Sequence, residues 1–291
     1  MKYSKPPLSI DDQLSLLQSR GVIVEQEEYA RNFLRHVGYY HLSAYCKHYQ
    51  NHDDVFIEGT TFEQIKDTYT FDRRLILLCF DAIERIEISL RAQMTNELAM
   101  SHGVLWYLEE DLYGNQQKLL RSQEDFKEEI DKTKSREGFL KEFYRKYTTE
   151  NWPPSWIMME ILSFGKTVRC LGNLKRNHQN RISAAYQINN IVLLSWLRGL
   201  VDIRNICAHH ERLWNREIKP AEQPRVGNFR VPELRGSLFC YLVIIRKLLS
   251  KVSPTSTWSK KIYEIIKDNE NFHDSLGCPK DWGVYFPEPT S

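Results

Sequence analysis

The segment 191–213 carries five polar side chains at intervals of four, three, four and three residues: Arg198, Asp202, Asn205, His209 and Arg212. At about 100° per residue, these positions fall on one side of an α-helix. Residues 191–201 are otherwise almost entirely apolar, which predicts a helix that is buried on its other faces. Because charged groups are costly to bury without partners, we expect the polar stripe to line a cleft, or a subunit interface that forms one.

These residue types suit the cleavage of RNA. A histidine can take the proton of a ribose 2′-hydroxyl as that oxygen attacks phosphorus, or can donate a proton to the leaving 5′-oxygen. An arginine can neutralise charge on the phosphoryl oxygens, with Arg198 and Arg212 as supporting cations. Asn205 can bind the phosphate or hold the imidazole, and Asp202 can fix the tautomer of His209. The scheme needs no metal, so the sequence predicts neither a metal site nor a cofactor.

Arg204 does not belong to this stripe. In an ideal helix it lies about 140° from His209, toward the apolar side, so it reaches the stripe only by a curled side chain or a local irregularity of the helix. An earlier amphipathic helix could orient such an arginine, because Glu84 and Glu87 lie on its polar face. The alternative is a solvated face on which Glu87 pairs with Arg91 one turn later.

Each of these residues also has a structural explanation. Arg204 and His209 could form a buried polar network with no catalytic role. His210 and Cys207 suggest a metal site, but adjacent histidines cannot bind one ion from one helix face, and no carboxylate stands at ligand spacing. Aromatic residues could stack RNA bases, yet at helical spacing they are more often core. We therefore predict packing roles for Tyr39, Tyr40, Tyr45, Trp152, Trp156, Trp196 and Trp214.

The elements that position these residues are predicted to be helices. The 291 residues include only 13 glycines and 11 prolines, which favours long helices with short connections. Apolar spacing and helix-start signals predict helices over 9–21, 25–37, 38–45, 62–100, 156–170, 191–213, 234–251 and 259–268. One short strand is expected at 55–57. The polar segment 109–137 is predicted to be an exposed helix or a mobile insertion. The basic segment 173–181 is predicted to be a solvated loop, with contact to RNA phosphates as the alternative.

These patterns predict a mainly helical chain with minor short strands. The length of the chain suits one large domain or two small ones. We divide the chain into an N-terminal helical extension over 1–60, a helical core over 61–255, and a C-terminal helix and tail over 256–291.

The charge balance argues against broad, non-specific binding of nucleic acid. The chain has 40 Lys and Arg residues against 38 Asp and Glu, a formal net charge of +2. No global field draws such a protein onto RNA. RNA would be bound through local basic patches, or through basic residues that a dimer brings together.

The cysteines and the N-terminus bear on the cellular compartment. None of the six cysteines forms a C-x-x-C pair, so a disulfide framework or zinc finger is not expected. Four lie in apolar helical patterns and are predicted to be core residues: Cys79, Cys170, Cys207 and Cys240. The N-terminus lacks an apolar signal-peptide core, and the longest apolar runs are broken by Arg198 or too short to span a bilayer. We therefore expect a cytoplasmic protein that does not associate with membranes.

Arg204-Asn205-x-x-x-His209 matches the R-x4–6-H signature of HEPN ribonucleases, including the common Asn after the Arg. The segment from Arg31 to His36 fits the same pattern, and we interpret it as a decoy or at most an auxiliary element. More widely, the sequence resembles the Abi-like family of bacterial abortive-infection proteins, the AbiD/AbiF group, over about residues 8–250. His41 departs from this family, which commonly has arginine there. The matching segments are 37–45, 71–75, 83–87, 154–165 and 196–215.

The resemblance implies an all-α HEPN-type helical bundle with an N-terminal extension. It implies an endoribonuclease toxin that arrests growth during phage infection. Its catalytic roles transfer to Arg204, Asn205 and His209, with His210 as a second choice. Such nucleases usually pair two motifs across a homodimer, and some relatives are thought to be restrained by an RNA or protein antitoxin. The alternative is a HEPN-fold module that binds RNA or senses phage without catalysis.

Overall fold

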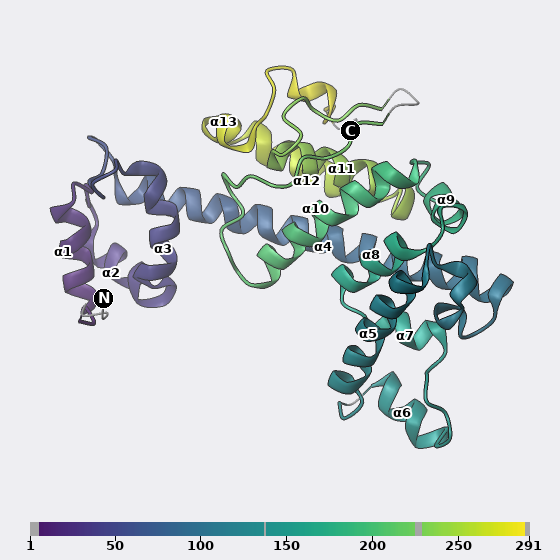
Figure 1. Cartoon of the computed structure of the whole chain (residues 1–291). Helices are drawn as coiled ribbons and strands as arrows, with labels where there is room; N and C mark the ends of the chain where they lie inside the picture. The colour runs from purple at the N-terminus through teal and green to yellow at the C-terminus, as the bar shows by residue number, and fades with distance from the viewer. Residues whose placement is uncertain (1–5, 137, 225–228, 289–291) are drawn as a thin grey trace. The chain divides into compact units, whose positions relative to one another are not determined.

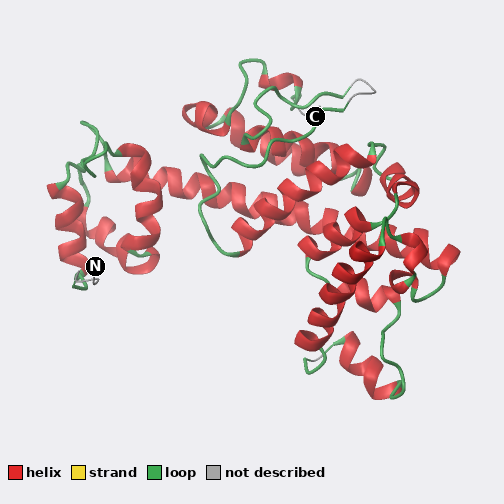
Figure 2. Ribbon diagram, in the orientation of Figure 1, coloured by secondary structure: helices red, strands yellow, loops and turns green. Residues whose placement is uncertain are grey.

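The structure, a computed structural model, describes residues 6–136, 138–224 and 229–288. These residues form α-helices and short 3-10 helices joined by loops, and they contain isolated β-bridges but no strand (Figure 2). The prediction of an all-α fold is confirmed. The chain divides into two compact units, Met1–Leu77 and Leu78–Ser291, and the boundary in the sequence falls within helix α4 (Phe62–His102). The expected divisions after residues 60 and 255 stay predictions.

The N-terminal unit contains α1 (Ile10–Ser19), α2 (Glu27–Val37), α3 (Tyr39–Cys46) and the first part of α4 (Figure 1). A capping box begins α1, because the Ser9 hydroxyl accepts from the backbone of Asp12 while the Asp12 carboxylate accepts from the backbone of Ser9. This confirms the predicted helix start. Helices α1 and α2 pack against each other.

Aromatic side chains fill the centre of the N-terminal unit. Tyr45 is buried, and its hydroxyl donates a 2.8 Å hydrogen bond to the buried Asp72 carboxylate. His41 meets Tyr69 edge to face, with ring centroids 5.8 Å apart. The packing role predicted for Tyr45 is confirmed. For Tyr40 the prediction was wrong, because that side chain is 91% exposed.

The strand expected at 55–57 does not form. Phe56 makes a single antiparallel bridge with Gln50 and has no further partner strand. The Asn51 side chain instead accepts from the backbone N–H groups of Asp53 and Val55, which closes a local turn. Three residues of alternating exposure are too few to indicate a strand when a turn of this kind competes.

The larger unit contains the rest of α4 and the helices that surround α10. They are α5 (Gln116–Thr133), α6 (Phe139–Lys146), α7 (Ser155–Ile161), α8 (Phe164–Asn173), α9 (Arg176–Ala184), α10 (Asn190–Ala208), α11 (Leu238–Val252), α12 (Trp258–Lys267) and α13 (His273–Leu276). Helix α10 packs against α8, α9 and α11, as Figure 1 shows. None of the helices within the described ranges combines the length and apolarity needed to cross a membrane.

Helix α4 has the predicted pattern of apolar residues. Its side chains at Leu75, Ala82, Ile86 and Leu90 are fully buried, in steps of four and seven. The hydroxyl of Ser89 lies 3.0 Å from that of Tyr186, just after α9, and the Trp258 indole donates to the Leu78 carbonyl at 2.8 Å. The buried side of this helix is therefore covered by elements from distant parts of the sequence.

Two predictions about the larger unit were wrong. The helix expected over 156–170 is interrupted at Leu162 and Ser163, whose ψ angles of 138° and 154° separate α7 from α8. The segment 173–181 is not a solvated loop. It contains most of α9, in which His178 and Gln179 are buried. Leu174, just before α9, is buried as well, so three positions of this basic segment turn toward the core.

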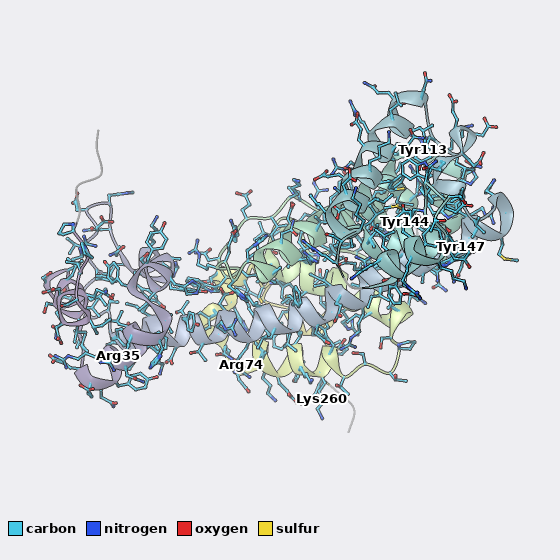
Figure 3. The ribbon with its side chains drawn as sticks, turned by 90° about the horizontal axis from the view of Figure 1, so that it is seen from below. Arg35, Arg74, Tyr113, Tyr144, Tyr147 and Lys260 are labelled. Atoms are coloured by element: carbon cyan, nitrogen blue, oxygen red, sulfur yellow. The ribbon has the colours of Figure 1, made fainter. Side chains whose placement is uncertain are left out.

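The segment 109–137 contains α5, a helix with one buried side. Leu119, Ser122, Asp125 and Phe126 face inward, and α5 packs against α8. Tyrosines lie around this region (Figure 3), where the buried Tyr113 hydroxyl donates to the Tyr107 carbonyl at 2.7 Å. The segment is thus a helix, as one of the two predicted alternatives states, but its inner side belongs to the core.

The tryptophans that were predicted to pack in the core differ in their exposure to solvent. Trp196 and Trp214 are buried, which confirms their packing roles, whereas Trp156 is 50% exposed and does not belong to the core. The four cysteines predicted to be core residues, Cys79, Cys170, Cys207 and Cys240, are all buried, which confirms the prediction.

Candidate active site at the C-terminal end of helix α10

Helix α10 ends where the predicted motif ends. The His209 N–H donates to the Asn205 carbonyl at 3.0 Å, and His209 has φ −93° and ψ 7°. The next residue, His210, is left-handed, with φ 56°. Its N–H donates to Cys207, and that of Glu211 donates to Ile206. This is the Schellman arrangement, in which glycine is the usual left-handed residue. A histidine there is uncommon, and it turns the chain sharply away from the helix axis.

This turn shortens the predicted polar stripe. The prediction carried the helix through to Arg212, but the helix ends at Ala208, so Arg212 lies outside it. The Arg212 side chain is half-buried, and its carbonyl accepts from the Arg216 guanidinium at 3.4 Å. The stripe that forms contains Arg198, Asp202 and Asn205, and it ends at His209.

Asn205 and His209 stand at the surface. Both side chains are exposed, and four residues of helix place one above the other on the same face. His210 is also exposed, while Cys207 between them is buried. An amide and an imidazole are thus presented together to solvent, where a polymer could reach them.

Arg204 is held by a carboxylate from α4. Its Nε lies 3.6 Å from Glu87 Oε2, and Glu87 is only 6% exposed. Arg91 donates to the other oxygen of the same carboxylate and, at 2.8 Å, to the Leu162 carbonyl. Arg91 also pairs with Glu160 at 3.7 Å. Glu87 therefore pairs with Arg91 on its own helix, as one alternative states, and with Arg204 of α10, but it does not stand on a solvated face.

Burial and charge act in opposite directions on this carboxylate. Burial raises the pKa of Glu87, and the nearby charges of Arg91 and Arg204 limit that rise. A buried carboxylate between two guanidinium groups fixes the position of both. The Arg204 side chain remains 32% exposed, so part of its guanidinium is open to solvent.

Asp202 and Arg198 take positions away from the imidazoles. Asp202 Oδ2 pairs with Lys219 Nζ at 3.3 Å, so the carboxylate expected to fix the His209 tautomer has a lysine as its partner. Arg198 is exposed and lies near Gly172 of α8. Both residues line a cavity of about 390 Å³ between α5, α8 and α10. Helical spacing could not predict Lys219 as the partner of Asp202, because Lys219 lies in an irregular segment beyond the helix.

The second copy of the motif has a different environment. Arg31 pairs with Asp11 at 2.7 Å and with Glu27 at 2.9 Å, in the N-terminal unit. These two carboxylates stand on α1 and α2, so Arg31 joins the two helices. Its ion pairs account for Arg31 without any catalytic role.

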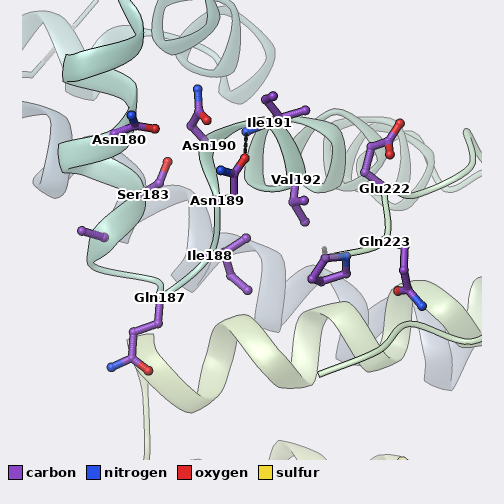
Figure 4. A pocket seen from close by; sticks show the side chains of 12 residues that line it. Asn180, Ser183, Gln187, Ile188, Asn189, Asn190, Ile191, Val192, Glu222 and Gln223 are labelled. Carbon is purple, nitrogen blue, oxygen red and sulfur yellow. Dashed lines mark hydrogen bonds between the residues drawn. The ribbon is translucent and has the colours of Figure 1, made fainter. Parts of the chain in front are cut away.

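Another cavity lies at the other end of α10 (Figure 4). Its volume is about 770 Å³, and neutral amides from Asn180, Gln187, Asn189, Asn190 and Gln223 line it together with apolar groups. The two ends of α10 are about 27 Å apart at 1.5 Å per residue. The carboxylate of Glu222 also lines it, and none of the lining residues is a histidine, lysine or arginine.

Comparison with known proteins agrees with the resemblance seen in the sequence. A family model described as Abi-like protein matches residues 32–215, which is more than half of the chain and includes Glu87 and the whole of α10. A search of curated proteins found no match, and neither did a search of solved structures. The extent of the family match shows that the chain belongs to the Abi-like protein family.

Proposed function

We propose that this chain is a metal-independent endoribonuclease of the HEPN type that acts in abortive infection. Membership of the Abi-like family suggests a role in abortive infection. The observation that carries the nuclease proposal is the arrangement at the end of α10. Asn205 and His209 are exposed one turn apart there, and Glu87 holds Arg204 from the side.

In the proposed reaction the ribose 2′-oxygen attacks the adjacent phosphorus. His209 takes the proton of the 2′-hydroxyl as the new oxygen–phosphorus bond forms. The bond from phosphorus to the 5′-oxygen breaks, and that oxygen receives a proton from a second group. The products are a 2′,3′-cyclic phosphate and a 5′-hydroxyl. An imidazole suits this work because it titrates near neutral pH.

Arg204 stabilises the charge that develops on the phosphoryl oxygens. A guanidinium has five N–H donors, and the approach to Glu87 is made by Nε. The two terminal nitrogens can therefore face a phosphate while the carboxylate keeps the side chain in place. Asn205 donates its amide N–H to the phosphate or to the imidazole.

The reaction needs both a base and an acid, and one chain supplies a single His209. We propose that two copies form a homodimer in which the two α10 ends make one composite site. The equivalent histidine of the second copy then donates the proton to the leaving oxygen. His210 is the alternative donor within one chain.

An endoribonuclease of this kind must be restrained in a healthy cell. We therefore expect an RNA or protein antitoxin, and we expect both substrate and antitoxin in the cytoplasm. Five cysteines are buried outside any disulfide, which suits a reducing compartment. Nucleic acid that copurifies with the chain, or a protein that binds it and prevents cleavage, would identify the antitoxin.

The test is incubation of the purified protein with total RNA and with tRNA in the presence of EDTA. Wild type should cleave, and Arg204→Ala and His209→Ala should not. His36→Ala is the matched control, since it alters the second motif, and it should cleave like wild type. If wild type binds RNA but leaves it intact, and His209→Ala binds equally well, the chain is a non-catalytic binding module.

A further inference from the structure

Four basic side chains converge on the 390 Å³ cavity beside α10. We call this cavity the basic pocket and define it by Lys118, Arg169, Arg198 and Lys219. One carboxylate, that of Asp202, also lines it. Such a concentration of positive charge stands out in a chain whose formal net charge is only +2.

Distant segments build the basic pocket. Lys118 comes from α5, Arg169 from α8, Arg198 from α10, and Lys219 from the irregular segment after α10. Helix α8 presents glycine to α10, and a Cβ on Gly172 would lie 3.8 Å from a terminal nitrogen of Arg198. The Arg198 side chain therefore lies beside Gly172 of α8 and is exposed.

The charges of the basic pocket are only partly neutralised. Arg169 pairs with Asp125 at 3.1 Å, and Lys219 pairs with Asp202 at 3.3 Å. Lys118 and Arg198 have no carboxylate partner within 4.0 Å in the part of the chain that the structure describes. The side chains of Arg169 and Lys219 are 56% and 70% exposed. Exposed cations of this kind attract a polyanion from solution.

We propose that the basic pocket binds the phosphodiester backbone of single-stranded RNA and leads it to His209. The inference rests on the proposed nuclease function and names a substrate-binding surface for it. Arg198 and His209 belong to one stripe of α10, about 16 Å apart along the helix axis. A strand that follows this stripe has one phosphate in the pocket and its reacting phosphate a few nucleotides further along.

The proposal is tested by binding rather than by cleavage. A labelled oligouridylate is titrated with the full chain carrying His209→Ala, over a range of salt concentrations. Adding Lys118→Gln and Arg198→Gln should weaken binding by about tenfold and reduce the salt slope by about 1.4, since each lost contact to single-stranded nucleic acid removes roughly 0.7. The matched control adds Lys260→Gln and Lys261→Gln, which neutralise two exposed lysines of α12, and it should leave the slope unchanged.

A variant that binds RNA more tightly would show that the effects arise from the basic pocket and not from a loss of folded protein. Asp202→Asn removes the only carboxylate among the lining side chains, so it should tighten binding and steepen the salt dependence. Misfolding produces neither effect.

Three results would overturn the proposal. They are equal slopes for the two double variants, weaker binding by Asp202→Asn, and binding of a mononucleotide or pyrophosphate without binding of oligouridylate. RNA binding that depends on the pocket, without cleavage by wild type, would support the proposal and contradict the nuclease function.

Discussion

Glu87 of α4 and Arg204 of α10 form an ion pair, with 3.6 Å between Oε2 and Nε, although they are distant in sequence. Glu87 does not face the solvent-exposed Asn205 and His209 itself, so we assign it to positioning. Glu87→Gln keeps the shape of the side chain and loses its charge. We expect cleavage to fall by about tenfold, mostly in kcat, because Arg204 is no longer fixed against the carboxylate.

The control for this prediction is Glu84→Gln, which alters an exposed carboxylate one turn earlier on α4. It should cleave like wild type. Thermal unfolding of both variants checks the fold. A Glu87→Gln protein with full kcat and unchanged stability would show that the ion pair does not position Arg204 for catalysis.

His210→Gly should stabilise the protein. His210 has φ 56°, a conformation that costs a residue with a side chain about 1 kcal/mol relative to glycine. We expect the free energy of unfolding in urea to rise by about that amount, with cleavage retained if His209 is the base. His209→Gly should instead lower stability, because φ at that position is −93°, and it should abolish cleavage. Loss of cleavage in His210→Gly would make His210 a catalytic residue.

Stability should decrease in mild acid because of His178. Burial, together with the charges of His102, Arg181 and Lys175, lowers the pKa of the His178 imidazole below its ordinary value of 6.5. Its Nδ1 is buried without a hydrogen-bond partner among the described residues. Between the folded and unfolded pKa values the unfolded chain binds more protons, so the free energy of unfolding increases with pH. The contribution is complete above about 6.5 and is lost as the pH falls through the folded-state pKa.

The measurement for His178 is the midpoint of urea unfolding as a function of pH from neutral to mildly acidic. His178→Gln should flatten the acid side of that curve. An identical slope in wild type and His178→Gln would show that other groups cause the loss of stability.

Gly199→Ala should destabilise the contact between α10 and α11. A Cβ at residue 199 would overlap the Tyr241 hydroxyl, which donates a 2.7 Å hydrogen bond to the Lys219 carbonyl. Because both helices are rigid there, we expect a loss of about 3 kcal/mol in chemical denaturation. Gly172→Ala is the comparison, since its Cβ would make an ordinary 3.7 Å contact with Leu194. It should keep or increase stability, and equal losses for both variants would contradict the argument.

Local periodicity predicted the long helices of this chain, but it missed the short helices α6, α9 and α13 and failed where a few residues decide. In α4 and α10 the apolar residues recur in steps of three and four over many residues, and both helices were predicted. The break at Leu162 and Ser163 involves only two residues, which interrupt an apolar run without a proline or glycine between them. The exposure of Tyr40 and Trp156 depends on which elements lie nearby, and residue type alone does not reveal it.

The candidate site was predicted in part for the same reason. Asn205 and His209 share a helix face, so their spacing predicted their proximity. The end of the helix depends on a left-handed histidine where glycine is usual, so the sequence offered no stop signal and Arg212 was placed on the wrong side of it. Glu87 was named as one of two carboxylates that could orient an arginine, but only the packing of α4 against α10 identifies Arg204 as its partner.

The Glu87 ion pair also offers a way to sort short motifs in other chains. Both six-residue segments here contain the same first and last residues, and the environment of the arginine distinguishes them. Arg31 is neutralised by exposed carboxylates on its own and the adjacent helix, whereas Arg204 meets one buried carboxylate from a remote helix. A search pattern that requires an acidic residue at the buried edge of a long preceding helix would reject the first kind of segment and keep the second.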